Sequence, residues 1–417
     1  MNKNPDTFPP HYRRNFVAFL VDYVCFGVAF NFFNPTSVLP AFVGQLTTSA
    51  PVVGLASTIF RGGWLLPQLA VARLINDKPR KKPCLLIGTV GRAAFWVIGL
   101  ALWAGLARYP SAMLALFFAA IALFSIGDGT SSVAWFDLVA RAVPAKRRAR
   151  LFGAGQVISG VLGIGAGALM GLILDSPRFA FPNDYALIFG LAGVVFIPSF
   201  VALFAIREPA PESTGSQSDS QVKGGWFKLL STDSTFLVLT ASRILVGLVD
   251  IATPFYVGHA SEVLGLPESV VGEFVIAQTV AGVIASVLLS LVRGRWGARL
   301  VIRIGSVSAM LGPLFALVAH LVGGGWLARA YPFVYVAIGI LNSTWMLGFF
   351  DYLLEIAPDG MRPAYVGLSN TIMGVTTLAP VAGGWLLEAT SYTALFGLTS
   401  ALVGVGFVLA LGLRPLE

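Results

Sequence analysis

Residues 136–153 read FDLVARAVPAKRRARLFG, and residues 350–367 read FDYLLEIAPDGMRPAYVG. The two stretches carry the same residue at five positions, each pair 214 positions apart with no gap. Each stretch follows a long apolar segment and leads into a short polar loop. A repeat at this spacing, in a chain of 417 residues, predicts two structurally similar halves. The matched pairs are Phe136 and Phe350, Asp137 and Asp351, Pro144 and Pro358, Arg148 and Arg362, and Gly153 and Gly367.

The composition around the repeat is that of a membrane protein. Hydrophobic residues make up 56% of the chain and charged residues only 12%, against about 25% charged residues in soluble domains. These values exclude a disordered chain, a disulfide scaffold and a water-soluble globule, because so few charges cannot cover a soluble surface. At about 20–25 residues per span, the length suits twelve helices with short loops. The fold class that we predict is therefore an all-α polytopic membrane protein with twelve transmembrane helices in two pseudo-symmetric six-helix bundles. The predicted spans are 15–43, 52–75, 84–106, 111–142, 150–174, 185–206, 234–262, 269–292, 300–322, 332–357, 364–388 and 392–413.

The longest polar break divides the chain into two halves. Residues 207–231 are rich in Ser, Gly and Pro and are typical of a flexible linker. They follow the sixth predicted span. We expect an N-terminal six-helix bundle over 1–206, a cytoplasmic linker over 207–231 and a C-terminal six-helix bundle over 232–417.

The basic residues predict the orientation. Of the 28 Lys and Arg, 22 fall in loops or ends on the side that carries the N-terminus, three on the other side and three within spans. The positive-inside rule then places both termini in the cytoplasm. The N-terminus lacks the layout of a signal peptide, so we expect the first span to be retained in a multi-pass protein of the inner (plasma) membrane. The net charge of +8 reports this topology, and no nucleic-acid partner is expected.

Several loops resemble those of the major facilitator superfamily of secondary transporters. The loop 77–82 (DKPRKK) is similar to the acidic-then-basic loop between spans two and three of that family, and 294–299 (GRWGAR) keeps its basic residues. The stretch 144–153 resembles the loop after span four, and 379–384 (APVAGG) resembles a Gly-Pro motif, although here it lies in span eleven. The resemblance covers nearly the whole chain. It implies two bundles that rock about a central site lined by spans one, four, seven and ten.

Polar residues inside the predicted spans are candidates for that site, because a buried ionisable group costs about 2.5–3.5 kcal/mol at mid-bilayer. Asp128 and Trp135 are seven residues apart in span four and share a helix face. Asn342 and Trp345 occupy the corresponding face of span ten by the repeat. A carboxylate among aromatic rings suits an amphipathic or weakly cationic solute and would carry a proton; the alternative is a purely structural role.

Spans one, two and seven add further candidates. Asp22 is either a proton site or the partner of Arg92, and Asn31 and Asn34 either bind substrate or bond across helices. Arg61 either binds an anion or, as we favour, neutralises Asp128. Arg243 and Asp250 are too far apart along span seven for easy direct pairing, so each is expected to meet another group.

The predicted cytoplasmic helix ends carry a second set of charges. Asp137 and Arg141 are four residues apart and can pair with each other, whereas Asp351 and Glu355 are like charges that require a cation such as Arg362 or a basic loop. The resemblance implies that these residues, with Asp77, form a cytoplasmic gate; the alternative is that they are solvated helix ends.

The sequence shows no motif that is typical of a metal, cofactor or catalytic site. The three histidines, His11, His259 and His320, are expected to be isolated surface or lining residues. No ATP-binding loop, metal-ligand spacing or catalytic triad is present, so we expect no enzyme activity, no cofactor and no metal.

We predict a proton-coupled transporter that moves a small amphipathic solute by alternating access, with export favoured. The alternatives are a uniporter or an organic-anion importer that uses intramembrane arginines, or a lipid flippase on the same fold. The expected partners are the solute, protons and membrane lipid, with the protein a monomer.

Overall fold

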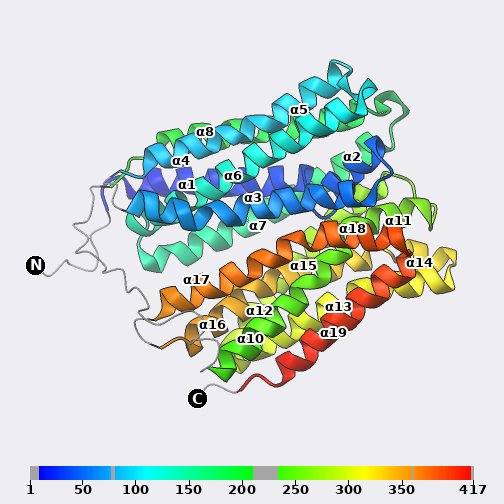
Figure 1. Ribbon diagram of the computed structural model, residues 1–417. Helices are drawn as coiled ribbons and strands as arrows, with labels where there is room; N and C mark the ends of the chain where they lie inside the picture. The colour runs from blue at the N-terminus through cyan, green and yellow to red at the C-terminus, as the bar shows by residue number, and fades with distance from the viewer. Residues whose placement is uncertain (1–8, 77–79, 210–232, 359–360, 415–417) are drawn as a thin grey trace, which may run out of the picture. The chain divides into compact units, whose positions relative to one another are not determined.

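The computed structural model describes residues 9–76, 80–209, 233–358 and 361–414, and all regular elements in these ranges are helices (Figure 1). Within them, 11 helical stretches are long and apolar enough to cross a membrane. Helix α3 (Ala50–Asn76) is 27 residues long but carries Arg61 and Arg73, which lower its mean hydropathy, and it is not among the 11. With α3 included, the helices account for the twelve predicted spans. Asp77 and most of the predicted linker lie outside the described residues.

The described chain separates into two compact units. The first unit takes the chain up to Asn34 and again from Ile59 to the linker. The second takes Pro35–Thr58 together with the chain beyond the linker. Helix α3 therefore contributes its first turns to the second unit and the rest of its length to the first. The division at 1–206 and 232–417 stays a prediction.

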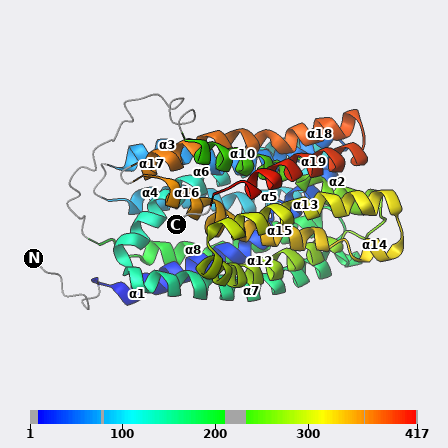
Figure 2. The ribbon, with the colours of Figure 1, turned by 90° about the horizontal axis from the view of Figure 1, so that it is seen from below.

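The first unit is a bundle in which α1 packs against α7 and α8, α5 against α8, and α4 against α6 (Figure 2). Its interior is aromatic: Phe33 stacks on Phe95 at 4.3 Å between ring centroids and contacts Phe124 at 5.1 Å. These rings are almost fully buried, so apolar burial holds the bundle together around the polar site described below. Besides α3, its helices are α1 (Tyr12–Phe32), α4 (Lys82–Thr89), η1 (Val90–Ala93), α5 (Ala94–Trp103), η2 (Leu106–Arg108), α6 (Pro110–Ala142), α7 (Ala145–Leu174), η3 (Pro177–Phe179) and α8 (Asn183–Ala205).

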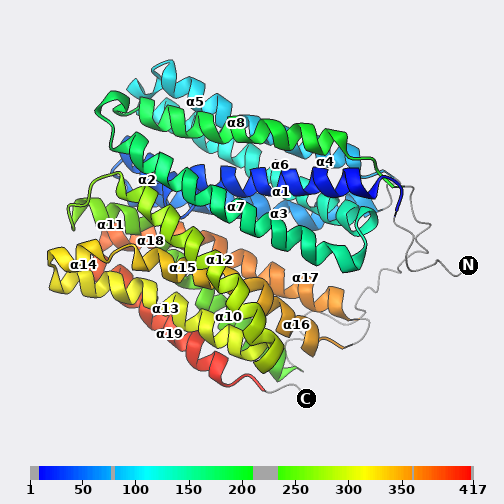
Figure 3. The ribbon, with the colours of Figure 1, turned by 180° about the vertical axis from the view of Figure 1, so that it is seen from behind.

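The second unit packs α12 and α13 against α15, and α10 and α13 against α19. The short helix α2 lies against α11 in this unit (Figure 3). Its helices are α2 (Val38–Leu46), α10 (Ser234–Gly247), η4 (Leu248–Ile251), η5 (Thr253–Phe255), α11 (Tyr256–Glu262), α12 (Val270–Trp296), α13 (Ala298–Val322), α14 (Gly325–Arg329), α15 (Phe333–Thr344), η6 (Trp345–Phe350), α16 (Asp351–Ile356), α17 (Arg362–Met373), η7 (Gly374–Leu378), α18 (Ala379–Ala389) and α19 (Tyr392–Leu411).

Two predicted spans are broken helices. The span predicted over 15–43 consists of α1 and α2, separated where Asn34 precedes Pro35. The span predicted over 234–262 consists of α10 and α11, separated by two 3₁₀ turns around Pro254. Proline removes a backbone donor and disfavours helical geometry at the preceding residue, which explains both breaks. Each of these predicted spans is therefore present, but it consists of two helices and not one.

The span predicted over 332–357 also departs from regular α-helix. Residues Trp345–Phe350 form a π-helix, η6, between α15 and α16. A π-helix has more residues per turn, so it shifts the directions of the side chains that follow. The repeat predicts that Met346 and Phe349 share the face of Asn342 and Trp345, but Phe349 is fully buried, whereas Met346 is 66% exposed.

Candidate functional site

Two glycines bring α4 and α6 into backbone contact. A Cβ added to Gly88 would lie 2.4 Å from the carbonyl oxygen of Gly127 and 2.2 Å from Ser131 Oγ. Neither distance is possible for a real side chain, so only glycine at 88 permits this approach. Arg92 follows Gly88 by about one helical turn and is thereby brought against Asp128 on α6.

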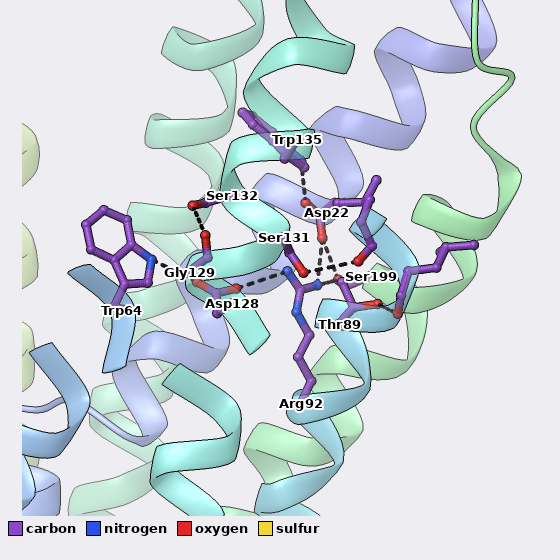
Figure 4. A network of polar contacts seen from close by, with 12 residues as sticks. Asp22, Trp64, Thr89, Arg92, Asp128, Gly129, Ser131, Ser132, Trp135 and Ser199 are labelled. Atoms are coloured by element: carbon purple, nitrogen blue, oxygen red, sulfur yellow. Dashed lines mark hydrogen bonds and ion pairs between the residues drawn. The ribbon is translucent and has the colours of Figure 1, made fainter. Parts of the chain in front are cut away.

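Arg92 lies at the centre of a buried network whose residues come from five helical segments, α1, α3, η1, α6 and α8 (Figure 4). Its Nη1 donates to Asp22 Oδ1 at 2.8 Å, and its Nη2 lies 3.6 Å from Asp128 Oδ1. Arg92, Asp22 and Asp128 are 7%, 3% and 8% exposed. Two carboxylates therefore share one guanidinium away from solvent.

Asp22 is the better stabilised of the two carboxylates. Besides Arg92, Trp135 Nε1 donates to its Oδ2 at 2.8 Å and Ser199 Oγ donates to its Oδ1 at 2.6 Å. The Arg92 Nη1 group also donates to Ser199 Oγ. Three donors, from Arg92, Trp135 and Ser199, therefore bind the Asp22 carboxylate.

Asp128 has weaker partners and greater access. Its ion pair with Arg92 is long, and its Oδ2 accepts one hydrogen bond, from Trp64 Nε1 at 3.2 Å. The Asp128 side chain is 11% exposed, compared with 4% for Asp22, and Trp64 is 39% exposed. Asp128 thus lies at the more open edge of the network.

Aromatic rings complete the surroundings of Arg92. Its guanidinium carbon lies 5.0 Å from the ring centroid of Phe196 and 5.5 Å from that of Phe26. The Arg92 Nε is buried and has no hydrogen-bond partner within the described residues. With all three ionisable groups charged, the network carries one net negative charge, and one added proton would make it neutral.

The sequence predicted part of this network. Asp128 and Trp135 share a face of α6 as expected, and the pairing of Asp22 with Arg92 is one of the two alternatives weighed. Arg92, Ser199 and Trp64 were not among the predicted site residues. We favoured Arg61 as the neutralising group for Asp128, but Arg92 pairs with it; Arg61 is half-buried on α3.

The other candidates of spans one and ten have different surroundings. Asn31 donates to the carbonyl of Gly27 at 2.8 Å, and both Asn31 and Asn34 are buried where α1 ends. Asn342 is exposed on α15. Trp345 begins the π-helix and packs on Phe349 at 5.0 Å.

Arg243 and Asp250 do not form an ion pair with each other. Arg243 donates through Nη1 to Ser369 Oγ at 2.7 Å and through Nη2 to Asn370 Oδ1 at 3.4 Å. Within the described residues it has no carboxylate within 4.0 Å, and its Nε is buried without a partner. Asp250 is buried in η4. Both serine and asparagine are neutral, so the charge of Arg243 is not compensated within the part of the second unit that is described.

The predicted pair Asp137–Arg141 is present and belongs to a larger cluster in the first unit. Arg141 Nη2 lies 2.7 Å from Asp137 Oδ2 and 3.1 Å from Glu208 Oε1, and Lys81 Nζ lies 3.2 Å from Asp137 Oδ1. Glu208 also accepts the backbone N–H groups of Lys81, at 2.7 Å, and Lys82, at 3.2 Å. Glu208 was missed, because it lies 67 residues from Arg141 in the sequence.

Asp351 and Glu355 share a cation, as two like charges four residues apart require. That cation is Arg293 at the end of α12: its Nε pairs with Asp351 Oδ2, and its Nη2 lies 2.6 Å from Glu355 Oε1. Arg293 belongs to the basic residues near the loop after span eight, one of the two sources that we expected. Arg362, the other cation that the sequence offered for Asp351 and Glu355, is the first residue of α17.

Comparison with known proteins agrees with the fold. No curated protein sequence matches the chain. Among solved structures, a bacterial homologue of the iron transporter ferroportin, in its inward-facing state, has 17% identity and a TM-score of 0.72, covering 96% of this chain and 98% of that one. A D-xylose–proton symporter has 15% identity and a TM-score of 0.72 over 97% and 98% of the two chains. A nucleoside transporter has 12% identity and a TM-score of 0.68 over 96% and 100%.

These likenesses establish the fold, and the sequence establishes the family. The model of the Major Facilitator Superfamily matches residues 23–377, which is most of the chain. The repeat, the helices and this match lead to one conclusion: the protein belongs to the Major Facilitator Superfamily of membrane transporters.

Proposed function

We propose that this protein is a proton-coupled secondary transporter and that Asp128 carries the proton. The observation that carries the proposal is the sharing of Arg92 by Asp22 and Asp128 in a buried site. One guanidinium cannot neutralise two carboxylates, and a buried excess charge is costly. Binding one proton removes that excess.

The unequal partners of the two carboxylates support Asp128 as the carrier. Asp22 accepts three hydrogen bonds, including one from Trp135, whereas Asp128 accepts one from the half-exposed Trp64. Protonating Asp22 would disrupt the stronger of the two sets of hydrogen bonds. When Asp128 is neutral, Arg92 is free to pair fully with Asp22, so the proton changes the contact between η1 and α6.

The proposed substrate is a small amphipathic solute, exported from the cytoplasm by alternating access. Trp64 gives the open edge of the site an aromatic surface beside a carboxylate, which suits a partly apolar, weakly cationic molecule. We place the protein in the inner membrane as a monomer with both termini in the cytoplasm, following the distribution of Lys and Arg. The clusters around Asp137 and Arg293 are then the proposed cytoplasmic gate.

The test uses proteoliposomes that contain a pH-sensitive dye and carry an imposed pH gradient. A panel of amphipathic cations and neutral solutes is added outside, and substrates are those that accelerate loss of the gradient. We expect Asp128→Asn to abolish this acceleration. The matched control is Asp175→Asn, because Asp175 is exposed at the end of α7 and has the same chemistry. If Asp128→Asn retains the acceleration seen in the wild type, Asp128 is not the proton carrier.

A second candidate function rests on Arg243. Its guanidinium contacts only neutral side chains among the described residues, Ser369 and Asn370, so it is available to an anionic group. This favours an organic-anion importer or uniporter, with Arg61 as the other candidate ligand. In the same liposomes, uptake of a labelled carboxylate that persists in Asp128→Asn but is lost in Arg243→Gln would favour this function over the first.

A further inference from the structure

Four elements of the second unit bring a histidine pair and two tyrosines together. His259 on α11 and His320 on α13 lie 3.2 Å apart, measured from His259 Nε2 to His320 Nδ1. The other ring nitrogen of His259, Nδ1, lies 2.9 Å from the hydroxyl of Tyr331. The Tyr392 ring of α19 lies 5.0 Å from the His259 ring and 6.1 Å from the His320 ring. The expectation that these two histidines are isolated was wrong. Their contact could not be predicted, because 61 residues separate them in the sequence.

The pair is enclosed at its inner end and more open at its outer end. His259 is 0% exposed and packs edge-on against Phe396 at 5.1 Å, whereas His320 is partly exposed. Both histidines lie near the ends of their helices, at the end of the second unit remote from the start of α10 and the end of α19. A proton can therefore reach His320 without crossing the unit.

The hydrogen bonds limit the pair to one added proton. When both rings are neutral, one ring N–H lies between His259 Nε2 and His320 Nδ1 and the other nitrogen accepts it. One added proton leaves this bond in place, now between an imidazolium and an imidazole, and charge assistance strengthens it. A second proton would put N–H groups on both facing nitrogens and two like charges about 3 Å apart, which breaks the bond.

Among the described residues, the groups that contact the pair include no carboxylate that could act as a direct counter-charge. Tyr331, in the turn between α14 and α15, and Tyr392 of α19 present neutral hydroxyls, and Tyr256 and Tyr335 are buried nearby. The nearest carboxylate in this contact chain is Glu262, one turn after His259, whose Oε2 accepts from the Tyr392 hydroxyl at 3.1 Å. The charge of a protonated pair is therefore best placed on His320, the more exposed ring.

The backbone of His259 also anchors the loop that follows α11. Its carbonyl oxygen accepts the N–H groups of Val263, at 3.1 Å, and Leu264, at 3.2 Å. The same loop carries Glu268, which accepts from Gln45 Nε2 of α2 at 3.0 Å. A change at His259 is thus linked through the loop to α2.

We propose that His259 and His320 form a single site that binds one proton and that its occupancy sets the stability of the α11 end and the loop after it. The site is separate from Asp128, and the proposal stands whether or not transport is proton-coupled. Its ligand is the proton of the medium on the side of the membrane that this end faces. The structural consequence is a loop, tied to α2, whose anchoring responds to pH.

The chain's three histidines make the site directly observable. The full-length protein, labelled with ¹⁵N at histidine and placed in lipid nanodiscs, is followed by NMR from about pH 8 to about pH 5, the range in which histidine titrates. His11→Gln removes the exposed third histidine and assigns its signal. We expect the two remaining rings to change together and to take up one proton between them. Full and independent conversion of both rings to imidazolium, or no change in either, would overturn the proposal.

Hydrogen exchange tests the structural consequence in the same samples. We expect the amides of Val263 and Leu264 to change their exchange rate between the two ends of the titration, beyond the intrinsic effect of pH. The amide of Gly297, which caps α12 at its other end by donating to Arg293, is the internal control. In His320→Gln the wild-type response at Val263 should be lost, while His11→Gln should keep it. An unchanged response in His320→Gln contradicts the proposed link. If His320→Gln does not fold, wild type and His11→Gln still test the proposal, because an exchange rate at Val263 that does not respond to pH in either of them also contradicts it.

Discussion

Gly384 lies so close to Pro51 that a Cβ on the glycine would be 2.5 Å from both the Cα and the nitrogen of the proline. The contact joins α18 to the start of α3 within the second unit. A hydrogen bond from the backbone N–H of Ala50 to Glu388 Oε1, at 3.0 Å, lies beside it. Only a residue without a side chain permits this approach.

Gly384→Ala should therefore destabilise the second unit, because the new methyl group must displace backbone atoms of Pro51. Overpacking of this kind costs about 1–3 kcal/mol. The measurement is the midpoint of thermal unfolding in detergent. Gly397→Ala in α19 is the matched control, since a Cβ there meets nothing within 4 Å. Equal midpoints for the two variants would contradict the close contact.

Arg92→Gln should be among the most destabilising single changes in the first unit. It leaves Asp22 and Asp128 buried without their shared cation, and breaking a buried pair costs about 3–5 kcal/mol. Adding Asp128→Asn to the same chain removes one of the two uncompensated charges and should recover part of the loss. Arg150→Gln, at an exposed position of α7, is the control. A double variant no more stable than Arg92→Gln alone would argue against charge sharing.

The two tryptophans of the network should differ in importance. Trp135→Phe keeps an aromatic ring but removes the donor to Asp22 at 2.8 Å, with an expected loss of about 1–3 kcal/mol. Trp64→Phe removes a longer bond, 3.2 Å, from a side chain that is 39% exposed, so its effect should be smaller. Unfolding midpoints of the two variants measure the difference. A larger loss for Trp64→Phe would contradict the conclusion that Asp22 is better stabilised by its hydrogen bonds than Asp128.

Salt should distinguish the cluster around Arg293 from the network around Arg92. Arg293, Asp351 and Glu355 are about one-third exposed, so Arg293→Gln should cost no more than about 1 kcal/mol. Because solvent ions screen such pairs, the loss should shrink as salt is raised. The loss caused by Arg92→Gln should not change with salt. Unfolding at low and high salt measures both, and a salt-independent Arg293→Gln would contradict the exposure seen here.

Local patterns in the sequence predicted the helices, the repeat and the contacts that follow from helical spacing. Asp128 and Trp135 lie seven residues apart on one face and reach one network, and Asp137 pairs with Arg141 one turn away. The breaks near Pro35 and Pro254 also have local causes. The break near Pro35, and the extent of the one around Pro254, were seen only in the structure.

Contacts between distant helices were beyond prediction from a single sequence. Asp22 and Arg92 are 70 residues apart, and Ser199 lies a further 107 residues beyond Arg92. The depth and rotation of each helix decide which of the available charges meet, and the glycine contact between α4 and α6 sets that geometry for Arg92. For the same reason Arg61, an equally plausible cation in the sequence, was preferred wrongly as the partner of Asp128.

The π-helix at Trp345–Phe350 means that equal sequence positions in the two halves do not point in equal directions. From Phe136 and Phe350 onward the repeat aligns without a gap, yet α6 reaches its aspartate, Asp137, by regular α-helix and the second half reaches Asp351 through a wider turn. A chimera that grafts one half's span onto the other by sequence alignment would therefore misdirect the side chains beyond Thr344. Engineering that treats the halves as interchangeable must first remove or reproduce this turn.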